Sequence, residues 1–546
     1  MDETALARIL AYHERTKHHF HRYAPGPGYL DWATQPDPFR HYAGAPGLAL
    51  TRREPQPDEP PWYDDLFGRL PPAAVNADTL SVLLFHSFAL SAWKAVSGSR
   101  WSLRCNPSSG NLHPTEVYLL TGPIPGLTVN PGLYHYNPWF HGLEVRAEPV
   151  VAPDSEWSQS LPANALVFGF TSIHWRESWK YGERALRYCL LDLGHAFAAL
   201  GFSAAALGWS CVLLPFVERK RLARLLGVAG QQGPEAEHPD CLAAVFPAGS
   251  VDWSSVCRWR PSDSVIAAIE SALRDDPPNR LSPAHRLWPI IERTVQALDR
   301  ESIVTIPAPE PSPAASSPRP VGARWLFRHR RSVQAMDGRT VMAQADFLRL
   351  LRRLLPGNLP VAELGCEAGV HLGFFIHRVG GLVPGLYFLA RSRSGLDLFR
   401  YSSRGDWEWL VPFPGLPFYR LQSGDARQIA KALSCHQGIA SDGAFAVAML
   451  AEFEPRLRRS VWEYARLHME AGALGQLLYL EAEAAGLRGT GIGCFFDDPV
   501  HELFALKNRD LQVIYHFTVG GGLEDKRLTA LDAYHHLRPA DSRAGA

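Results

Sequence analysis

A stretch rich in proline, alanine and serine divides the chain into two long halves. Residues 303–321 read IVTIPAPEPSPAASSPRPV, a composition that gives an extended and semi-stiff linker. The 546 residues are too many for one hydrophobic core and suit two domains of ordinary size. The sequence therefore predicts an N-terminal helix with a Pro- and aromatic-rich arm (1–75), a first domain (76–302), the linker (303–321) and a second domain (322–546).

Short sequence matches recur in the same order on both sides of the linker. The segment starting at Gly132 (GLY) returns at Gly385, 253 positions later, and the segment around Gly194 returns around Gly472, 278 positions later. An ordered series of matches indicates a repeated unit. We expect two copies of one fold that pack as an intramolecular dimer.

Hydrophobic periodicity predicts helices and strands that alternate along each copy. This pattern is typical of an α+β fold in layers. In the first half we expect helices at 3–17, 78–97, 185–207 and 218–226, and strands at 116–121, 132–136, 166–172 and 241–247.

The overall composition is that of a globular protein without a strongly charged partner. Hydrophobic residues make up 46% and charged residues 20%, and 55 Lys and Arg balance 55 Asp and Glu. The total charge gives no reason to expect a nucleic acid or a membrane surface as partner. The polar N-terminus predicts no signal peptide, and the apolar runs predict buried helices, so we expect a cytoplasmic protein.

The eight cysteines are scattered and form no CxxC pair. Neither they nor the histidines have the spacing of a four-ligand metal set. We therefore expect buried free thiols in a reducing compartment, and no metal site.

The segment Arg104–Glu116 (RCNPSSGNLHPTE) is the most distinctive polar stretch of the first half. Pro107 restricts the backbone, Ser108 or Ser109 can cap a following helix, and Gly110 allows close approach to the main chain. The resulting amides and hydroxyls suit a planar ligand that accepts hydrogen bonds, such as a flavin. A capped turn without a ligand explains the same residues, and spacing alone favours that simpler interpretation.

Several motifs together resemble the SagB-type dehydrogenase branch of the FMN-dependent nitroreductase superfamily. They are the Pro-Ser-Ser turn, GLYHY at 132–136 and KYGERALRYCLLDLGHAF at 180–197, with RRS at 330–332, the Gly-rich segment at 489–493 and VGGGLEDKR at 519–527. The resemblance covers roughly 80–300 and 325–535 and implies nitroreductase-like domains, each with an antiparallel-rich mixed sheet flanked by helices. It also implies an FMN site shared by two subunits, in which one supplies the turn and the other the Arg-x-Ser motif, the Gly-rich segment and terminal basic residues.

In this chain the motifs of that shared site are divided between the halves. The turn occurs only in the first half, and the Arg-x-Ser motif, the paired glycines and the basic pair occur only in the second. One complete composite site can be built, so the resemblance implies one FMN per chain. Its expected cofactor-binding residues are Pro107, Ser108, Ser109, Asn111, Arg330, Arg331, Ser332, Gln334, Gly491, Gly493, Cys494, Lys526 and Arg527.

Lys180 and Tyr181 precede the long apolar helix, in a segment dense with polar and aromatic side chains. In the azoline-oxidising relatives a Lys-Tyr pair at this place is thought to assist proton removal, which predicts a catalytic role for both residues. An ordinary surface pair at a helix start is the alternative.

The resemblance implies an FMN-dependent oxidoreductase in which hydride passes from a substrate, for example a thiazoline or oxazoline made from a peptide, to flavin N5. A NAD(P)H-dependent reductase of nitro compounds or quinones is a second hypothesis. A third is a non-catalytic scaffold or partner subunit in a peptide-modification complex. The candidate partners are a small-molecule or peptide substrate and a peptide-modification protein, and the sequence leaves open whether that protein is required.

Overall fold

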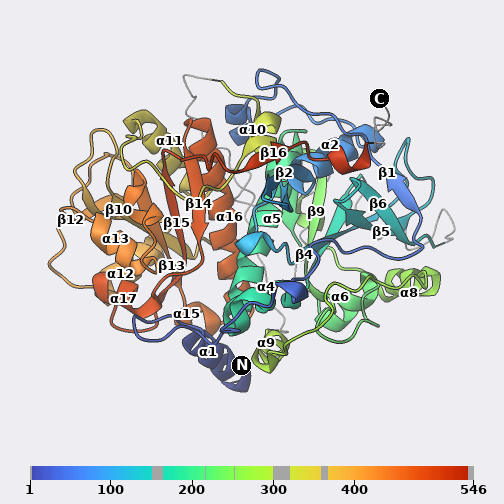
Figure 1. The fold of residues 1–546 in the computed structure, drawn as a ribbon, viewed down its shortest axis with the longest axis horizontal. Coiled ribbons are helices and arrows are strands. Elements are labelled where there is room, and N and C mark those ends of the chain that lie inside the picture. Colours follow the sequence, from blue (N-terminus) through green and yellow to red (C-terminus); the bar gives the residue numbers. More distant parts are fainter. Residues whose placement is uncertain are drawn as a thin grey trace.

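The computed structural model describes residues 3–149, 164–214, 217–250, 253–256, 258–298, 320–357 and 367–538. Within these ranges two antiparallel sheets stand on either side of a central pair of helices (Figure 1). The first sheet has the order β1-β6-β5-β4-β7-β9-β8, and the second has the order β12-β11-β10-β13-β15-β14. The linker predicted at 303–321 lies outside the described residues except for its last two positions.

The strands of the first sheet are β1 (Gly47–Ala49), β4 (Thr115–Thr121), β5 (Gly132–Asn137), β6 (Gly142–Ala147), β7 (Leu166–Ser172), β8 (Trp209–Leu213) and β9 (His238–Pro247). Those of the second are β10 (Val370–Ile376), β11 (Gly385–Leu389), β12 (Phe418–Ser423), β13 (Phe445–Glu452), β14 (Arg488–Ile492) and β15 (Leu511–Gly520). Without the short edge strand β1, both sheets place their third, second, first, fourth, sixth and fifth strands side by side in that order. The α+β class with antiparallel sheets is therefore confirmed.

Two long helices, α5 (Ala185–Ala205) and α16 (Glu463–Ala484), pack against each other between the sheets (Figure 1). A Cβ atom on Gly194 of α5 would overlap the main-chain oxygen of Met469, and one on Gly472 of α16 would overlap that of Leu191. The two contacts are reciprocal, because Gly472 lies 278 positions after Gly194 and Met469 lies 278 positions after Leu191. Only glycine permits this close approach of the two backbones.

Shorter helices pack around the two sheets and against the central helices. They are α2 (Ala77–Ser87), α4 (His174–Tyr181), α6 (Arg219–Leu225), α7 (Trp253–Val256), α8 (Asp263–Ala272) and α9 (Pro289–Ala297) in the first half, and α10 (Ala323–His329), α11 (Gln344–Leu354), α12 (Arg393–Ser402), α13 (Arg427–Leu433), α14 (Ile439–Asp442), α15 (Glu454–Leu457) and α17 (Asp497–Leu503) in the second.

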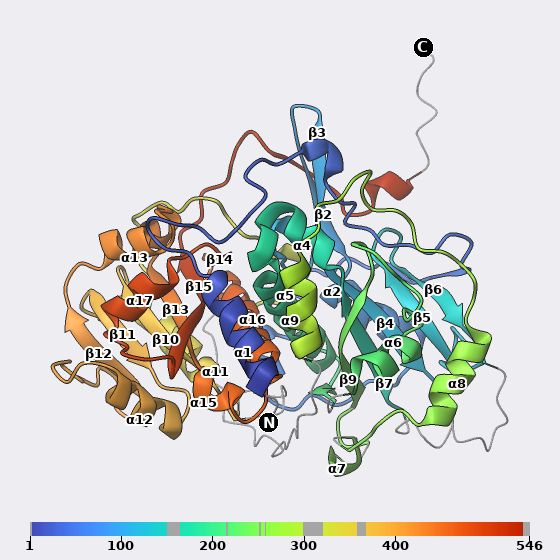
Figure 2. The ribbon, with the colours of Figure 1, turned by 90° about the horizontal axis from the view of Figure 1, so that it is seen from below.

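The N-terminal helix α1 (Glu3–Arg15) lies across the junction of the halves and beside α9 (Figure 2). At this junction the buried carboxylate of Asp497 accepts hydrogen bonds from Arg184 at 3.0 Å, from Arg187 at 2.7 Å and from the amide of His18 at 2.9 Å. One carboxylate of the second half is thus neutralised by two guanidinium groups of the first. Breaking such a buried network is costly because it leaves a charge unpaired.

The Pro-rich arm runs along both halves, as its composition predicts for a segment that cannot fold alone. Its Pro25 accepts a hydrogen bond from the amide of Glu183 at 2.9 Å, beside the end of α4. Farther along, Pro57 and Pro61 accept from the amides of Gly322 and Ala323 at the start of α10, each at 2.9 Å. The arm therefore connects α4 of the first half with α10 of the second.

The single helix predicted at 78–97 is wrong in its second part. The helix α2 ends at Ser87, and residues Leu90–Val96 form strand β2, which pairs with β3 (Ser99–Arg104) on one side and β16 (Thr529–Leu531) on the other. The C-terminal segment of the second half thus completes a small sheet on the first. A pairing between residues more than 430 positions apart overrides the local helical periodicity.

The other predicted elements of the first half agree with the structure to within a few residues, and the strand 166–172 coincides with β7. The helical stretch His174–Ala205 is long and apolar enough to cross a membrane, but 94% of its apolar window is buried inside the protein. It has the character of a core helix.

The expectation of free thiols throughout is wrong for two cysteines. Cys435 and Cys494 form a disulfide with their Cα atoms 5.8 Å apart, although 59 positions separate them in the sequence. The end of α13 and the segment after β14 meet in space, which a search for local cysteine pairs does not detect. Four other cysteines are buried and take part in no disulfide within the described residues, namely Cys105, Cys189, Cys211 and Cys241.

Candidate functional site

The Pro-Ser-Ser turn joins β3 to β4 through an unusual backbone. Gly110, Asn111 and His113 have φ angles of 59°, 60° and 52°. The left-handed region is strained for the two residues with side chains, and such strain clusters at functional sites. Asn111 is held by a hydrogen bond from its amide to the carbonyl of Ser102 at 2.8 Å and by a contact of 3.1 Å with His113 Nε2.

The two serines of the turn are bound by a buried carboxylate of the central helix. Asp192 of α5 accepts from Ser108 Oγ at 2.6 Å, from Ser109 Oγ at 2.9 Å and from the Ser109 amide at 3.0 Å. Burial raises the pKa of Asp192 to about 7, against the lowering effect of these hydrogen bonds. A carboxyl group with this pKa can exchange a proton near neutral pH.

Lys180 and Tyr181 at the end of α4 lie against the same turn. A Cβ atom placed on Gly110 would be 2.6 Å from the Tyr181 hydroxyl and 3.2 Å from Lys180 Nζ. The predicted catalytic pair and the predicted ligand-binding turn are therefore neighbours, and glycine leaves the space between them. Burial and the carboxylate of Glu177 raise the pKa of Tyr181 well above its usual range, so its phenol stays protonated at neutral pH.

Glu177 is a second buried carboxyl group at this place, one helical turn before Tyr181. Neither of its carboxylate oxygens has a hydrogen-bond partner within the described residues. Burial and the charge of Asp192 raise its pKa well above the ordinary value, while Lys180 opposes the shift. An unpaired buried carboxyl group is costly and is typical of functional sites.

Arg330 of the second half reaches the residues directly before the turn. It follows α10, and its guanidinium donates to the carbonyl of Cys105 at 3.1 Å and to that of Arg104 at 3.3 Å. The side chain is buried and packs over the ring of Tyr479 at 4.9 Å. Its Nη1 has no hydrogen-bond partner within the described residues. This buried guanidinium group therefore has one N–H donor available for a further acceptor. Burial lowers the pKa of Arg330.

Tyr479 of α16 connects the remaining second-half motifs. Its hydroxyl lies 2.8 Å from Ser332 Oγ and accepts a hydrogen bond of 3.0 Å from the amide of Gly491. The Thr490 hydroxyl donates to the carbonyl of Val333 at 2.8 Å and accepts from the amide of Val333 at 3.1 Å. The Arg-x-Ser segment and the Gly-rich strand β14 therefore lie side by side.

Gly491 of β14 and Gly493 directly after this strand leave room for tyrosines from both halves. A Cβ atom on Gly491 would overlap the hydroxyl of Tyr515, and one on Gly493 would overlap the ring of Tyr188 from α5. The Tyr188 hydroxyl donates to the carbonyl of Gly493 at 3.0 Å. Cys494, the next predicted residue, is part of the disulfide.

The other predicted cation and amide positions are spread over a wider area. Arg331 is engaged with three main-chain carbonyls, including that of Ser91 at 3.1 Å, and burial lowers its pKa to about 10. Gln334, Lys526 and Arg527 are exposed, and Arg527 pairs with Asp525 at 2.7 Å. Pro107 is buried under the turn.

The corresponding position on the other side of the central helices is occupied by salt bridges. Glu470 of α16, 278 positions after Asp192, accepts from the amide of Gly369 at 3.0 Å in the same manner. Arg466 at 3.1 Å and Arg391 also bind this carboxylate. The place that would mirror the turn thus has two guanidinium groups where the first half has two serines.

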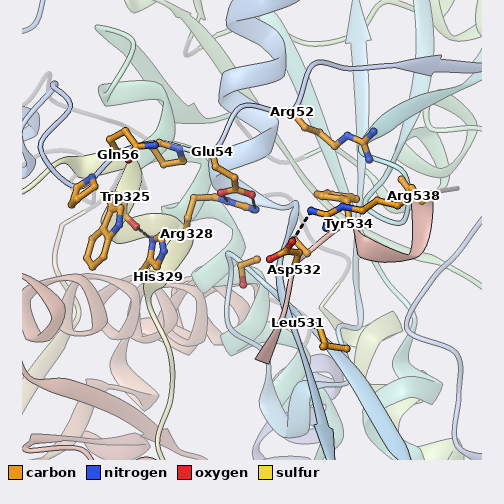
Figure 3. Close-up of a pocket in the computed structure, with 15 residues that line it drawn as sticks. Arg52, Glu54, Gln56, Trp325, Arg328, His329, Leu531, Asp532, Tyr534 and Arg538 are labelled. Carbon is orange, nitrogen blue, oxygen red and sulfur yellow. Dashed lines mark hydrogen bonds and ion pairs between the residues drawn. The ribbon is translucent and has the colours of Figure 1, made fainter. Parts of the chain in front are cut away.

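A cavity of about 640 Å³ lies elsewhere, between the arm, α10 and the C-terminal segment. Figure 3 shows Arg328 beside Glu54 on one side of it and Asp532 beside Arg538 on the other. None of the residues predicted for the site lines this cavity. Its lining has three arginines, Arg52, Arg328 and Arg538, against the two carboxylates of Glu54 and Asp532.

The comparisons with known proteins agree with this architecture. Residues 74–242 match the nitroreductase family. No curated protein matches the chain. A crystal structure of a nitroreductase candidate from Anabaena variabilis ATCC 29413 shares the fold with a TM-score of 0.63 at 22% identity, over 94% of this chain and 99% of that one. The N-terminal part therefore has a nitroreductase-like fold, and the chain shares the overall fold of that crystal structure over 94% of its length.

Two further structures share less. The E. coli microcin synthetase McbBCD complex with truncated pro-MccB17 gives a TM-score of 0.26 at 18% identity, over 46% of this chain and 95% of that one. A nitroreductase candidate in complex with FMN from Exiguobacterium sibiricum 255-15 gives 0.22 at 11% identity, over 36% and 87%. At such TM-scores we infer nothing from either.

Sequence reasoning missed the residues that organise the site from within α4, α5 and α16 and from β15. They are Glu177, Asp192, Tyr188, Tyr479 and Tyr515. Asp192 had a visible signal, because an acidic residue in the middle of a long apolar helix is rarely buried without a purpose. The tyrosines had none, since aromatic residues in such elements are usually core.

Proposed function

We propose that the protein is an FMN-dependent oxidoreductase with one cofactor site between its two halves. The observation that carries the proposal is the contact of Arg330 with the carbonyls of Arg104 and Cys105. This contact brings Arg330 of the second half, which has one free donor, to the Pro-Ser-Ser turn of the first half. Lys180 and Tyr181 lie beside the same turn. The match of residues 74–242 to the nitroreductase family supports the same class of chemistry.

We propose further that the halves, 76–302 and 322–546, are two copies of one nitroreductase-like unit packed as an intramolecular pseudo-dimer, with 1–75 as an arm and 303–321 as a linker. The matching strand orders and the reciprocal contacts of Gly194 and Gly472 support this. In a two-fold arrangement two equivalent sites are expected. The salt bridges at Glu470 support the loss of one of them.

The residues present fit an anionic cofactor. The free Nη1 of Arg330 can bind a phosphate oxygen with a charge-assisted hydrogen bond. Ser332, Gln334, Lys526 and Arg527 are exposed and can add donors. FMN supplies two-electron hydride transfer when it is bound.

The chain itself then has to position the substrate and move a proton. Asp192, with a pKa of about 7, can hold a proton taken from the substrate, and the Ser108 and Ser109 hydroxyls connect this carboxyl group to the turn. Lys180 places a positive charge where negative charge would develop. This arrangement supports a SagB-type dehydrogenation, in which the substrate loses a proton and a hydride; a peptide thiazoline or oxazoline is the proposed substrate class, with a peptide-modification partner.

One observation favours the reverse electron direction. Because burial keeps the Tyr181 phenol protonated, this residue is suited to donate a proton to a substrate. That role fits a NAD(P)H-dependent reductase of nitro compounds or quinones, which we keep as the second candidate. Reduction of bound FMN by NAD(P)H without peptide would favour the reductase, and reduction by an azoline peptide would favour the dehydrogenase.

The visible spectrum and flavin content of the purified protein test the shared proposal. We expect one FMN per chain, and two would contradict the division of the site. The variant Arg330→Ala should bind FMN roughly 10- to 100-fold more weakly, as expected for the loss of a charge-assisted hydrogen bond. Glu367→Gln, an exposed change on the other side of the molecule, is the matched control. Equal FMN affinity in both variants, or a colourless protein after addition of FMN, would refute the proposal and leave the scaffold hypothesis.

A further inference from the structure

We propose that His174, His238 and Glu292 form a binding site for a divalent transition metal, with Zn²⁺ as the best match. His174 is the first residue of α4, His238 is the first of β9, and Glu292 lies in α9. One ligand atom of each residue lies within 4.8 Å of those of the other two. Two imidazoles and one carboxylate are a common donor set for Zn²⁺, with water completing the coordination.

The imidazole of His174 is buried, and that of His238 is partly exposed. The rings of the two residues face each other with their centroids 4.3 Å apart. No hydrogen bond joins either ring to the part of the chain that the structure describes, and His238 Nε2 lies 3.6 Å from the Glu292 carboxylate. His174 is more than nine-tenths buried. A buried imidazole without a partner costs free energy, which a bound metal would recover.

Two charged side chains lie near the imidazoles, Arg219 and Glu292. The Arg219 guanidinium weakens the attraction for a cation, and the Glu292 carboxylate offsets it.

A second group with similar spacing shows what a satisfied cluster looks like. Glu14, His19 and Asp498 also bring three ligand atoms within 4.8 Å of one another. There the ammonium group of Lys17 binds Glu14 at 3.0 Å and Asp498 at 2.7 Å. That cluster already holds a cation and needs no metal, so it is a suitable internal control.

A metal at the proposed site would connect α9 to the N-terminal end of α4. The opposite end of α4 carries Lys180 and Tyr181. Sequence spacing did not reveal the site because its ligands come from three elements separated by more than 50 positions. The site does not depend on the proposed FMN chemistry, and it can be tested without any turnover assay.

The experiment is Co²⁺ and Zn²⁺ binding to the full-length protein after treatment with a chelator. We expect one Co²⁺ per chain with a visible d–d absorption band that Zn²⁺ abolishes. His238→Ala should weaken binding at least roughly tenfold, Glu292→Gln should also weaken it, and His19→Ala should leave it unchanged. We also expect Zn²⁺ to raise the thermal midpoint of the wild type and not that of His238→Ala.

Both Glu292 and His238 are at least partly exposed, so their variants should fold; equal circular dichroism spectra and equal thermal midpoints without metal will verify this. Absence of saturable Co²⁺ binding to the wild type would overturn the proposal. So would binding that His238→Ala and Glu292→Gln leave intact, or binding that only His19→Ala removes.

Discussion

The replacement of Asp192 by asparagine should change how the stability of the protein depends on pH. Burial raises the pKa of this carboxyl group from 3.8 to about 7. Below pH 4 the group is protonated in the folded and the unfolded protein, and it contributes no pH dependence. Between pH 4 and 7 the unfolded chain releases the proton while the folded protein retains it. The stability contributed by the protonated group is therefore lost as the pH rises through this window.

The magnitude follows from the size of the shift. With one more proton bound in the folded state, the free energy of unfolding falls by about 1.4 kcal/mol for each pH unit. Over about three units the loss amounts to roughly 4 kcal/mol. The amide that replaces the carboxyl group in Asp192→Asn carries no charge at any pH, so this contribution disappears in the variant. The change in hydrogen bonding to Ser108 and Ser109 shifts the whole curve by an amount that does not vary with pH, which is why the slope is the quantity to compare.

Urea-induced unfolding of the wild type and of Asp192→Asn, followed between pH 4 and 8, measures the slope. The free energy of unfolding of the wild type, minus that of the variant, should fall by several kcal/mol from pH 4 to 7 and stay constant above pH 7. Glu470→Gln at the mirrored position is the control. Burial would raise the pKa of Glu470, but the charges of Arg391 and Arg466 outweigh it and lower the pKa from its ordinary value of 4.5. This group loses its contribution only as the pH falls below about 4.5, so the wild type and Glu470→Gln should differ by a constant amount from pH 5 to 8. Equal slopes for the wild type and Asp192→Asn would refute the reasoning.

Two further predictions concern glycines that permit close contacts. Gly110→Ala places a methyl group 2.6 Å from the Tyr181 hydroxyl at a φ of 59°. Turnover should fall at least roughly tenfold, which is a loss of about 1.4 kcal/mol in transition-state stabilisation, while the FMN content stays the same. Loss of flavin instead would contradict the position assigned to Gly110. Gly194→Ala and Gly472→Ala each place a methyl group where it would overlap the main chain of the opposite central helix. Both variants should therefore lower the free energy of unfolding by about 1–3 kcal/mol or more. An effect in only one of them would contradict the reciprocal packing. Gly230→Ala, where a methyl group meets no atom within 4 Å, is the control for all three.

The predictions from sequence were most accurate where local pattern and tertiary environment agree. The strand at 166–172 and the helix from Ala185 follow from runs of apolar residues bounded by polar ones, and the structure has them at those places. The helix predicted at 78–97 shows the limit. Its apolar residues from Leu90 onward suit a helix or a strand equally, and pairing of β2 with β16 decides for the strand.

The candidate site divides in the same way. The turn at Pro107, the pair at Lys180 and the cation at Arg330 are recognisable from their neighbours along the chain. Their approach to one another depends on the packing of α5 on α16. The role of Asp192 was not predictable, because only the folded protein brings its carboxylate to Ser108 and Ser109.

By itself, the sequence determined the class of the fold, the repetition of its elements and the unequal distribution of polar motifs between the halves. These properties depend on hydrophobic periodicity and on short-range chain geometry, which act over a few residues. Only the tertiary structure decided which polar motifs of the two halves lie next to each other, which carboxyl groups are buried and titrate near neutrality, and which cysteines form a disulfide. The physical reason is that pKa values, ion pairs and disulfides depend on distances between atoms that the chain order does not specify, and burial then multiplies the effect of each contact.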